Sequence, residues 1–315
     1  CSSNEITSFN YNYLNGPNLQ YFNFSNNNLA GSIPSTINWE GIRYLSINNN
    51  FLTGYVTFLT QMTNLQYIQI SNNHFSSQLL PIMRPITSQL TMLPNITSLS
   101  LSGNTLTGTL PNFNCAKLYL FDISVNSIKG NLKSIISSSC SQLSNNNIPM
   151  KYFNVQSNSF TGSIPTQVIR FPKINFYGLS FNCLSGTIPQ DICPTVAPTT
   201  DDGDDDSFGG NHVFMNTSLQ ILSIDGLSVN SQCRQSPLVN NNIPRSDYLW
   251  PHFTGTIPIC LYQQENLNTL HLAGNGLTGS LPEDIEISST LTNLGLSFNN
   301  LYGTIPNNFQ THDFN

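Results

Sequence analysis

A sixteen-residue frame recurs along this chain, and the repetition constrains the fold more than any other feature of the sequence. The frame reads L-x-x-L-x-L-x-x-N-x-L-x-G-x-I-P, and clear copies span residues 19–34, 96–111, 174–189, 267–282 and 291–306. A unit that recurs at a fixed period cannot bury its apolar face alone, so it must stack on its neighbours. The sequence therefore predicts an elongated solenoid.

Eleven copies can be placed, most of them about 24 residues apart. The copies beginning at Leu219 and Ile243 are degenerate, and their placement depends on the spacing and on the intact ending Phe253–Pro258. We expect residues 1–18 to form a partial N-terminal coil and residues 19–315 the solenoid, with insertions near 80–94, 133–149 and 190–218. The expected coils begin at Leu19, Ile42, Leu65, Ile96, Leu118, Met150, Ile174, Leu219, Ile243, Leu267 and Leu291.

The alternating apolar residues of L-x-x-L-x-L predict a short strand with one buried face. Stacked coils would place these strands side by side in a parallel sheet that lines one side of the solenoid. The asparagine that follows each strand is expected to turn the chain and to satisfy backbone groups of neighbouring coils. The fold class expected is therefore a strand-dominated α/β solenoid with a parallel sheet on its concave face. The asparagines are Asn27, Asn50, Asn73, Asn104, Asn126, Asn158, Asn182, Asn275 and Asn299.

The charge content is low and excludes some classes of function. Only 8% of the 315 residues are charged, and 10 Lys and Arg against 16 Asp and Glu exclude a strongly basic nucleic-acid-binding protein. No stretch approaches the apolar length that spans a bilayer. The chain begins at Cys1 without a secretory leader, which fits a leader that has been removed.

The repeat ending, L-[TS]-G-x-[IL]-P, resembles that of plant-type leucine-rich repeat proteins. This family includes polygalacturonase-inhibiting proteins and the ectodomains of plant receptor kinases, and the resemblance covers residues 19–310. It implies a leucine-rich repeat superhelix, an extracellular or cell-surface location, a role in recognition and no enzymatic activity. The family usually brackets its coils with paired cysteines, whereas only Cys1 lies on the N-terminal side here and the last coil has none. Either the chain is a fragment, or another molecule covers its ends.

The seven cysteines and three N-glycosylation sequons indicate an oxidising compartment. Cys115 with Cys140, and Cys233 with Cys260, fall in adjacent coils and are the favoured disulfides. Cys183 with Cys193 follows by elimination, which leaves Cys1 unpaired. The sequons begin at Asn23, Asn95 and Asn216, and Asn23 would carry its glycan on the inner face.

Two groups of inner-face residues are candidates for binding. Aromatic residues occupy the third repeat position over the first part of the sheet, where they could form a binding surface, stabilise strand pairing, or both. Four ionisable residues gather on later coils, with Ser223 and Thr269 beside them, and a polar recognition patch or a solvated face is favoured there over a Ser/His/Asp catalytic site. The aromatic candidates are Tyr21, Tyr44, Tyr67, Tyr152 and Phe176, and the ionisable candidates are Asp225, Arg245, Asp247 and His271.

Two further patterns receive weaker interpretations. The acidic loop 201–206 is expected to be solvated, although its aspartates could collect Ca²⁺. We expect no cofactor and no other metal. Hydroxyl residues that precede the turn glycine could present an ice-binding surface, but they also belong to the ordinary repeat frame. The acidic residues are Asp201, Asp202, Asp204, Asp205 and Asp206, and the hydroxyl residues are Thr53, Thr107, Thr161, Ser185, Thr254 and Thr278.

The sequence favours a non-enzymatic recognition module that binds a protein, a peptide or a glycan on its concave face. The alternative is a structural glycoprotein subunit of an extracellular matrix or filament, in which copies of the chain assemble end to end. Ice binding is a more remote alternative.

Overall fold

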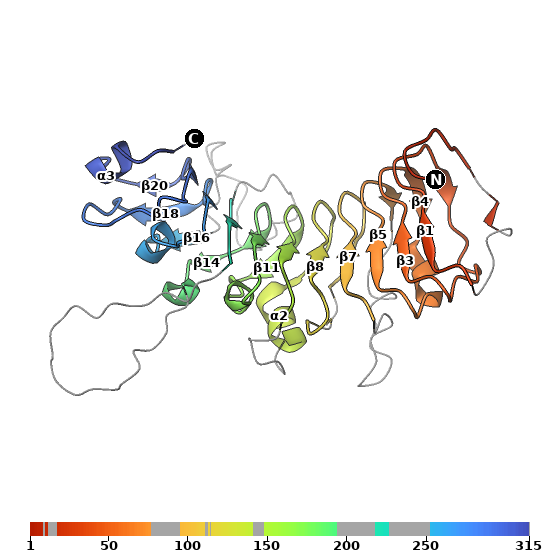
Figure 1. Cartoon of the computed structure of the whole chain (residues 1–315). Coiled ribbons are helices and arrows are strands. Elements are labelled where there is room, and N and C mark those ends of the chain that lie inside the picture. The colour runs from red at the N-terminus through yellow and green to blue at the C-terminus, as the bar shows by residue number, and fades with distance from the viewer. Residues whose placement is uncertain are drawn as a thin grey trace, which may run out of the picture.

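The chain forms an elongated solenoid whose coils succeed one another from the N-terminal to the C-terminal end (Figure 1). This computed structural model describes residues 1–8, 10, 11, 18–76, 95–110, 113, 115–140, 148–193, 218–226 and 253–314. The acidic loop 201–206, Asn216, Arg245 and Asp247 lie outside the described residues. Among the described residues, no helix has the length and apolar character needed to cross a membrane.

Ten short strands form one parallel sheet along the concave side. Neighbouring strands keep the same repeat position opposite one another, so that Tyr21 pairs with Tyr44 and Tyr44 with Tyr67. The sheet confirms the expected fold class. In spatial order the strands are β1 (Tyr21–Asn23), β3 (Tyr44–Ser46), β5 (Tyr67–Gln69), β7 (Ser98–Ser100), β8 (Leu120–Asp122), β10 (Tyr152–Asn154), β12 (Phe176–Gly178), β15 (Ile221–Ser223), β17 (Thr269–His271) and β19 (Asn293–Gly295).

The expected coil beginning at Ile243 does not exist as a separate layer of this sheet. Strand β15 pairs directly with β17, with Ile221 opposite Thr269. The N–H of Phe253 donates to Asn275 Oδ1 of the next coil, just as the N–H of Leu29 donates to Asn50 Oδ1 of the next coil near the N-terminus. The ending at Phe253 therefore completes the coil that begins at Leu219. The prediction of a coil at Ile243 was wrong because it relied on the spacing of apolar residues, although Pro251 stands where the repeat asparagine is expected.

After each turn, further short strands and helices complete the coils. The strands form three smaller parallel sheets. Helix α2 (Leu132–Cys140) occupies part of the insertion expected near residues 133–149. The strands are β2 (Ala30–Ser32), β4 (Phe51–Gly54) and β6 (His74–Phe75); β9 (Lys129–Asn131), β11 (Ser159–Gly162) and β13 (Cys183–Leu184); and β14 (Gly186–Thr187), β16 (Phe253–Gly255), β18 (Gly276–Gly279) and β20 (Asn300–Leu301). The other helices are the 3₁₀ turns η2 (Val56–Gln61), η4 (Val168–Arg170), η5 (Gln190–Ile192) and η7 (Ile259–Tyr262), and α3 (Asn307–Gln310).

The repeat asparagines link each coil to the one before it. Asn50 Oδ1 accepts a hydrogen bond from the N–H of Leu29 at 3.0 Å, and its Nδ2 donates to the C=O of Phe24 at 3.0 Å and of Ile47 at 3.1 Å. The expected role of these residues is thus confirmed, because all nine repeat the arrangement with their own coil and the preceding one. The residue before the asparagine adopts a positive φ in most coils, as at Asn49 and Asn72. Each strand therefore ends in the same tight turn.

The disulfides agree with the sequence at one pair and correct it at the others. Cys115 bonds to Cys140, as expected. Cys193 bonds to Cys260, so the expected pairs Cys233–Cys260 and Cys183–Cys193 are both wrong. With the Ile243 copy removed, Cys260 lies in the coil directly after that of Cys193, which explains the bond. Cys183 is also disulfide-bonded, and the free thiol among the described residues is that of Cys1.

Replacing a repeat asparagine should destabilise the fold strongly. Asn158→Ala would leave the buried N–H of Ile128 without its partner, whereas the C=O groups of Ile123 and Val155 would each keep one donor, from Asn126 and Asn182. Because an unpaired buried group costs roughly 1–3 kcal/mol, we expect the free energy of unfolding to fall by ~1–3 kcal/mol. Denaturant unfolding of the oxidised protein measures this. Asn64→Ala is the control, since its exposed side chain makes one hydrogen bond, to the C=O of Glu40. An equal loss of unfolding free energy in the two variants would contradict a special role for the repeat asparagines.

Candidate functional site

Three tyrosines stack on one another at the N-terminal end of the concave face. The ring centroids of Tyr21 and Tyr44 lie 4.2 Å apart with planes inclined by 10°, and those of Tyr44 and Tyr67 lie 4.4 Å apart at 7°. The repeat forces this arrangement, because all three residues hold the same position on adjacent paired strands. Each such pair contributes ~0.5–1.5 kcal/mol beyond the burial of its area. We call these three residues the tyrosine stack.

The hydroxyl groups of Tyr44 and Tyr67 stay neutral at physiological pH. Burial, followed by a hydrogen bond and a charge interaction with Tyr21, raises the pKa of Tyr44 to about 12. Burial also raises the pKa of Tyr67, whose hydroxyl accepts a hydrogen bond from Gln69 Nε2 at 2.6 Å. The stack therefore presents aromatic rings and hydroxyl groups that can both donate and accept hydrogen bonds.

A second apolar group continues the same column beyond Ser98. Leu120, Tyr152, Phe176 and Ile221 lie opposite one another in register, and we call these four residues the central apolar column. The rings of Tyr152 and Phe176 stack at 4.4 Å and 16°. All four side chains are partly exposed. The column therefore offers a strip of apolar contact across four coils.

Gly178 makes room for this column. A Cβ atom at Gly178 would lie 2.6 Å from the Phe176 ring and 2.9 Å from Asn154 Oδ1, both closer than real contacts allow. The bare backbone lets the Phe176 ring lean along its strand and remain stacked on Tyr152. On the neighbouring strand β10, the Tyr152 hydroxyl accepts a hydrogen bond from Asn154 Nδ2 at 3.2 Å.

A polar cluster lies at the next strands of the concave face. Asp225 Oδ1 accepts a hydrogen bond from the N–H of Ala273 at 2.7 Å, and the Asp225 N–H donates to the Ser180 hydroxyl at 2.7 Å. The Ser180 and Ser223 hydroxyls are also 2.7 Å apart. Burial raises the pKa of Asp225, while the Ala273 N–H and the charge of His271 act against this rise. The side chain is 14% exposed, so its carboxyl group is largely enclosed by these partners.

His271 lies at the edge of this cluster and does not activate a serine. Its Nδ1 is 3.9 Å from Asp225 Oδ2, and its Nε2 is 3.1 Å from Asn293 Oδ1. Within the described part of the chain, neither Ser223 nor Thr269 forms a hydrogen bond to the ring. The arrangement therefore lacks the contact between nucleophile and base that a Ser/His/Asp mechanism needs. No group of three or more His, Cys, Asp or Glu among the described residues is placed to hold a metal ion.

The structure thus brings together some of the predicted residues and adds others. The predicted residues that lie next to each other are the three tyrosines of the stack, the pair Tyr152 and Phe176, and the pair Asp225 and His271. Ser180, Gly178 and Asn293 were not among the predicted site residues. Their positions in the repeat frame, which the sequence alone gives, place them beside Asp225, Phe176 and His271.

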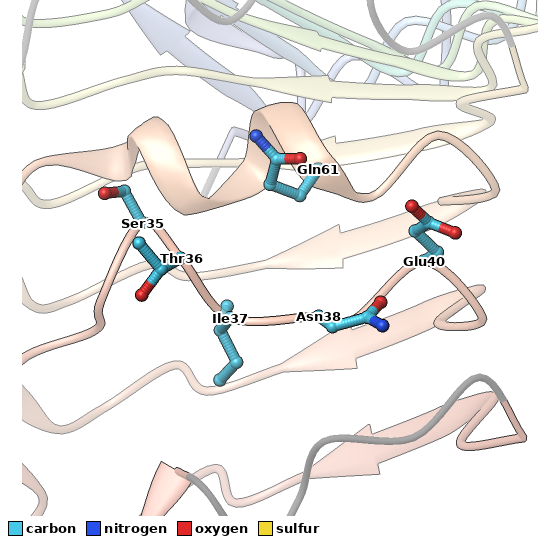
Figure 2. Close-up of a pocket in the computed structure, with 6 residues that line it drawn as sticks. All are labelled: Ser35, Thr36, Ile37, Asn38, Glu40 and Gln61. Atoms are coloured by element: carbon cyan, nitrogen blue, oxygen red, sulfur yellow. The ribbon is translucent and has the colours of Figure 1, made fainter.

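A shallow polar pocket of about 260 Å³ lies apart from the column. Figure 2 shows the segment 35–40 on one side of it and Gln61, at the end of η2, on the other. The carboxylate of Glu40 and several hydroxyl and amide groups line it, and no aromatic ring does. The concave column offers more apolar contact than this pocket.

Comparison with known proteins agrees with this architecture. The Leucine Rich Repeat family matches residues 18–39, 95–115, 266–286 and 290–312. No curated protein matches the sequence. Four segments of the chain thus match leucine-rich repeats, and the coils between them have the same frame.

Several solved structures of plant receptors share the fold. The plant peptide hormone receptor RGFR1 in complex with RGF2 is 22% identical, with a TM-score of 0.59 over 90% of this chain and 40% of that one. A TDR receptor is 20% identical, with a TM-score of 0.59 over 92% and 41%. The Arabidopsis receptor kinase HAESA, in complex with the peptide hormone IDA and the co-receptor SERK1, is 20% identical, with a TM-score of 0.58 over 91% and 43%. The chain thus spans about two fifths of each receptor chain.

Adding a methyl group at Gly178 should disrupt the central apolar column. In Gly178→Ala the new Cβ would force the Phe176 ring away from Tyr152, at a cost of about 1–3 kcal/mol in the free energy of unfolding. Denaturant unfolding measures the loss. Gly295→Ala is the matched control, because its Cβ would lie 3.1 Å from His271 Cδ2, at the end of a side chain that can move. A smaller loss in Gly178→Ala than in Gly295→Ala would contradict this packing.

Proposed function

We propose that this protein is a non-enzymatic extracellular or cell-surface recognition module that binds an extended peptide segment along its concave face. The observation that carries the proposal is the row of exposed or partly exposed aromatic and aliphatic side chains formed by the tyrosine stack and, beyond the buried Ser98, the central apolar column, on a sheet that is almost free of charge. Rigid aromatic side chains supply large contact area at low entropic cost, which is why they dominate binding hot spots. Proteins and glycans remain alternative ligands.

The length of the row formed by the tyrosine stack and the central apolar column suits a peptide. From Tyr21 to Ile221 this row crosses eight adjacent strands. At a strand spacing of ~4.8 Å this is roughly 34 Å, the length of about ten residues of extended chain. Gln69, which is partly exposed, lies beside this row and can pair with the backbone of a ligand. Asp225, at the far end, would favour a positively charged group. The similar receptors RGFR1, a peptide hormone receptor in complex with RGF2, and HAESA, in complex with the peptide hormone IDA, support the same class of ligand.

The alternative functions have less support. In the outer strands the row of hydroxyl residues is interrupted: Thr53 lies opposite Ser32 on one side but His74 on the other, and Thr161 lies opposite Asn131 and Cys183. These interruptions give the ice-binding alternative less support. Assembly of copies end to end would be detected by a change in oligomeric state with concentration.

Binding of peptides to the column can be tested by selection from a random library of extended peptides. We expect wild-type protein to enrich peptides whose affinity falls at least tenfold in Tyr152→Ala and Phe176→Ala, since a buried hot-spot side chain is worth about 1.4 kcal/mol or more. Tyr55→Ala is the control, because Tyr55 is a highly exposed tyrosine between β4 and η2, outside the concave sheet. Peptides that bind all variants equally well would exclude the column as the binding site.

A further inference from the structure

We propose that Asn23 carries an N-linked glycan whose first sugar packs on the exposed ring of Tyr21 and covers the N-terminal end of the concave face. The inference concerns a modification of the protein itself and does not depend on the identity of any ligand. It starts from the sequon Asn23-Phe24-Ser25, which lies on β1, the first strand of the ten-stranded sheet.

The side chain of Asn23 is arranged so that a sugar would displace no hydrogen bond. Its Oδ1 accepts hydrogen bonds from the N–H of Ser25 at 3.0 Å and from the Ser25 hydroxyl at 2.7 Å. Its Nδ2 makes no hydrogen bond within the described residues. Attachment of a sugar uses Nδ2 and leaves Oδ1 as an acceptor. The local turn would therefore survive the modification unchanged.

The repeat asparagines show the opposite arrangement. Asn27, four residues later, donates from Nδ2 to the C=O groups of Cys1, Phe24 and Ser25. A sugar on that nitrogen would break the ladder that joins the coils. Within the described residues, the amide nitrogen of Asn23 thus makes no hydrogen bond, whereas that of the repeat asparagine Asn27 makes three.

The transfer itself has a defined chemistry. Nδ2 forms a bond to the anomeric carbon of an N-acetylglucosamine carried by a lipid-linked oligosaccharide diphosphate. The bond between that carbon and the phosphate oxygen breaks, the lipid diphosphate leaves with the bonding electrons, and one Nδ2 proton is released to the solvent. No oxidation or reduction takes place.

Tyr21 provides the surface for the sugar. It precedes Asn23 by two residues on the same strand, so both side chains point to the concave face. One face of its ring stacks on Tyr44, and the side chain remains 59% exposed. The apolar face of a pyranose ring can cover such an exposed aromatic surface. A ligand on the modified protein would then be restricted to the coils from Tyr67 onward, which include the central apolar column.

An aspartate elsewhere in the chain shows which substitution can serve as a control without the glycan. Asp122 occupies the position of Asn23 on β8 and accepts the same two hydrogen bonds from Ser124, from the N–H at 3.0 Å and from the hydroxyl at 2.7 Å. Asn23→Asp should therefore fold normally while it abolishes the sequon. Ser25→Thr is the complementary variant, because it retains both the hydroxyl group and the sequon.

The experiment combines site occupancy with solvent accessibility. The protein is secreted from a eukaryotic host, and the peptide containing residue 23 is analysed by mass spectrometry before and after enzymatic removal of N-glycans in heavy-oxygen water. Hydroxyl-radical footprinting then compares Tyr21 and Tyr152 in the wild type, Asn23→Asp and Ser25→Thr. We expect an occupied site in the wild type and Ser25→Thr, with oxidation of Tyr21 several-fold lower than in Asn23→Asp and oxidation of Tyr152 unchanged. An unmodified Asn23 in the secreted protein, or equal oxidation of Tyr21 with and without the glycan, would overturn the proposal.

Discussion

The hydrogen bonds of the repeat asparagines are the interaction on which the rest of this structure depends. Each amide accepts one backbone N–H from the preceding coil and donates to carbonyl groups of both coils, as Asn50 does with Leu29, Phe24 and Ile47. These amides add to the direct backbone hydrogen bonds between successive turns, such as that from the Asn26 N–H to the C=O of Asn48, and together they give the buried backbone groups their partners. Stacking in one register then follows, and with it the alignment of every other position in the repeat.

The concave surface is a direct result of that register. A residue type repeated at the third position becomes a column in space, which converts three separate tyrosines into a stack and joins Tyr152 to Phe176. Glycine at the fifth position of the same frame admits rings that a side chain would exclude, as at Gly178. A binding surface on such a scaffold is therefore defined by the choice of residues at a few equivalent positions and needs no specialised loop.

The sequence predicts the frame well because the repeat carries its own register. The parallel sheet, the role of the asparagines and the order of the tyrosines follow from counting positions. The prediction was wrong at Ile243, where a coil was expected from apolar spacing without the repeat asparagine. This extra coil also led to the wrong pairing of Cys260 with Cys233 and of Cys183 with Cys193. Contacts that depend on the lean of side chains, such as Asp225 with Ser180 or His271 with Asn293, require coordinates, since the frame says which residues are adjacent and not how they orient.

The joint between the coils of β12 and β15 has a different mechanical character from the others. Every other successive pair of coils from β1 to β19 shares a repeat asparagine, whereas the coil that begins at Leu219 has Leu227 at that position. The Cys193–Cys260 disulfide links the same two coils, and by closing a loop of 67 residues it stabilises the folded state by about 4 kcal/mol. A tensile load along the solenoid would be carried at this joint by strand pairing and a covalent bond, without the asparagine that serves the other joints. The strength of this joint therefore depends on the redox state of the surroundings.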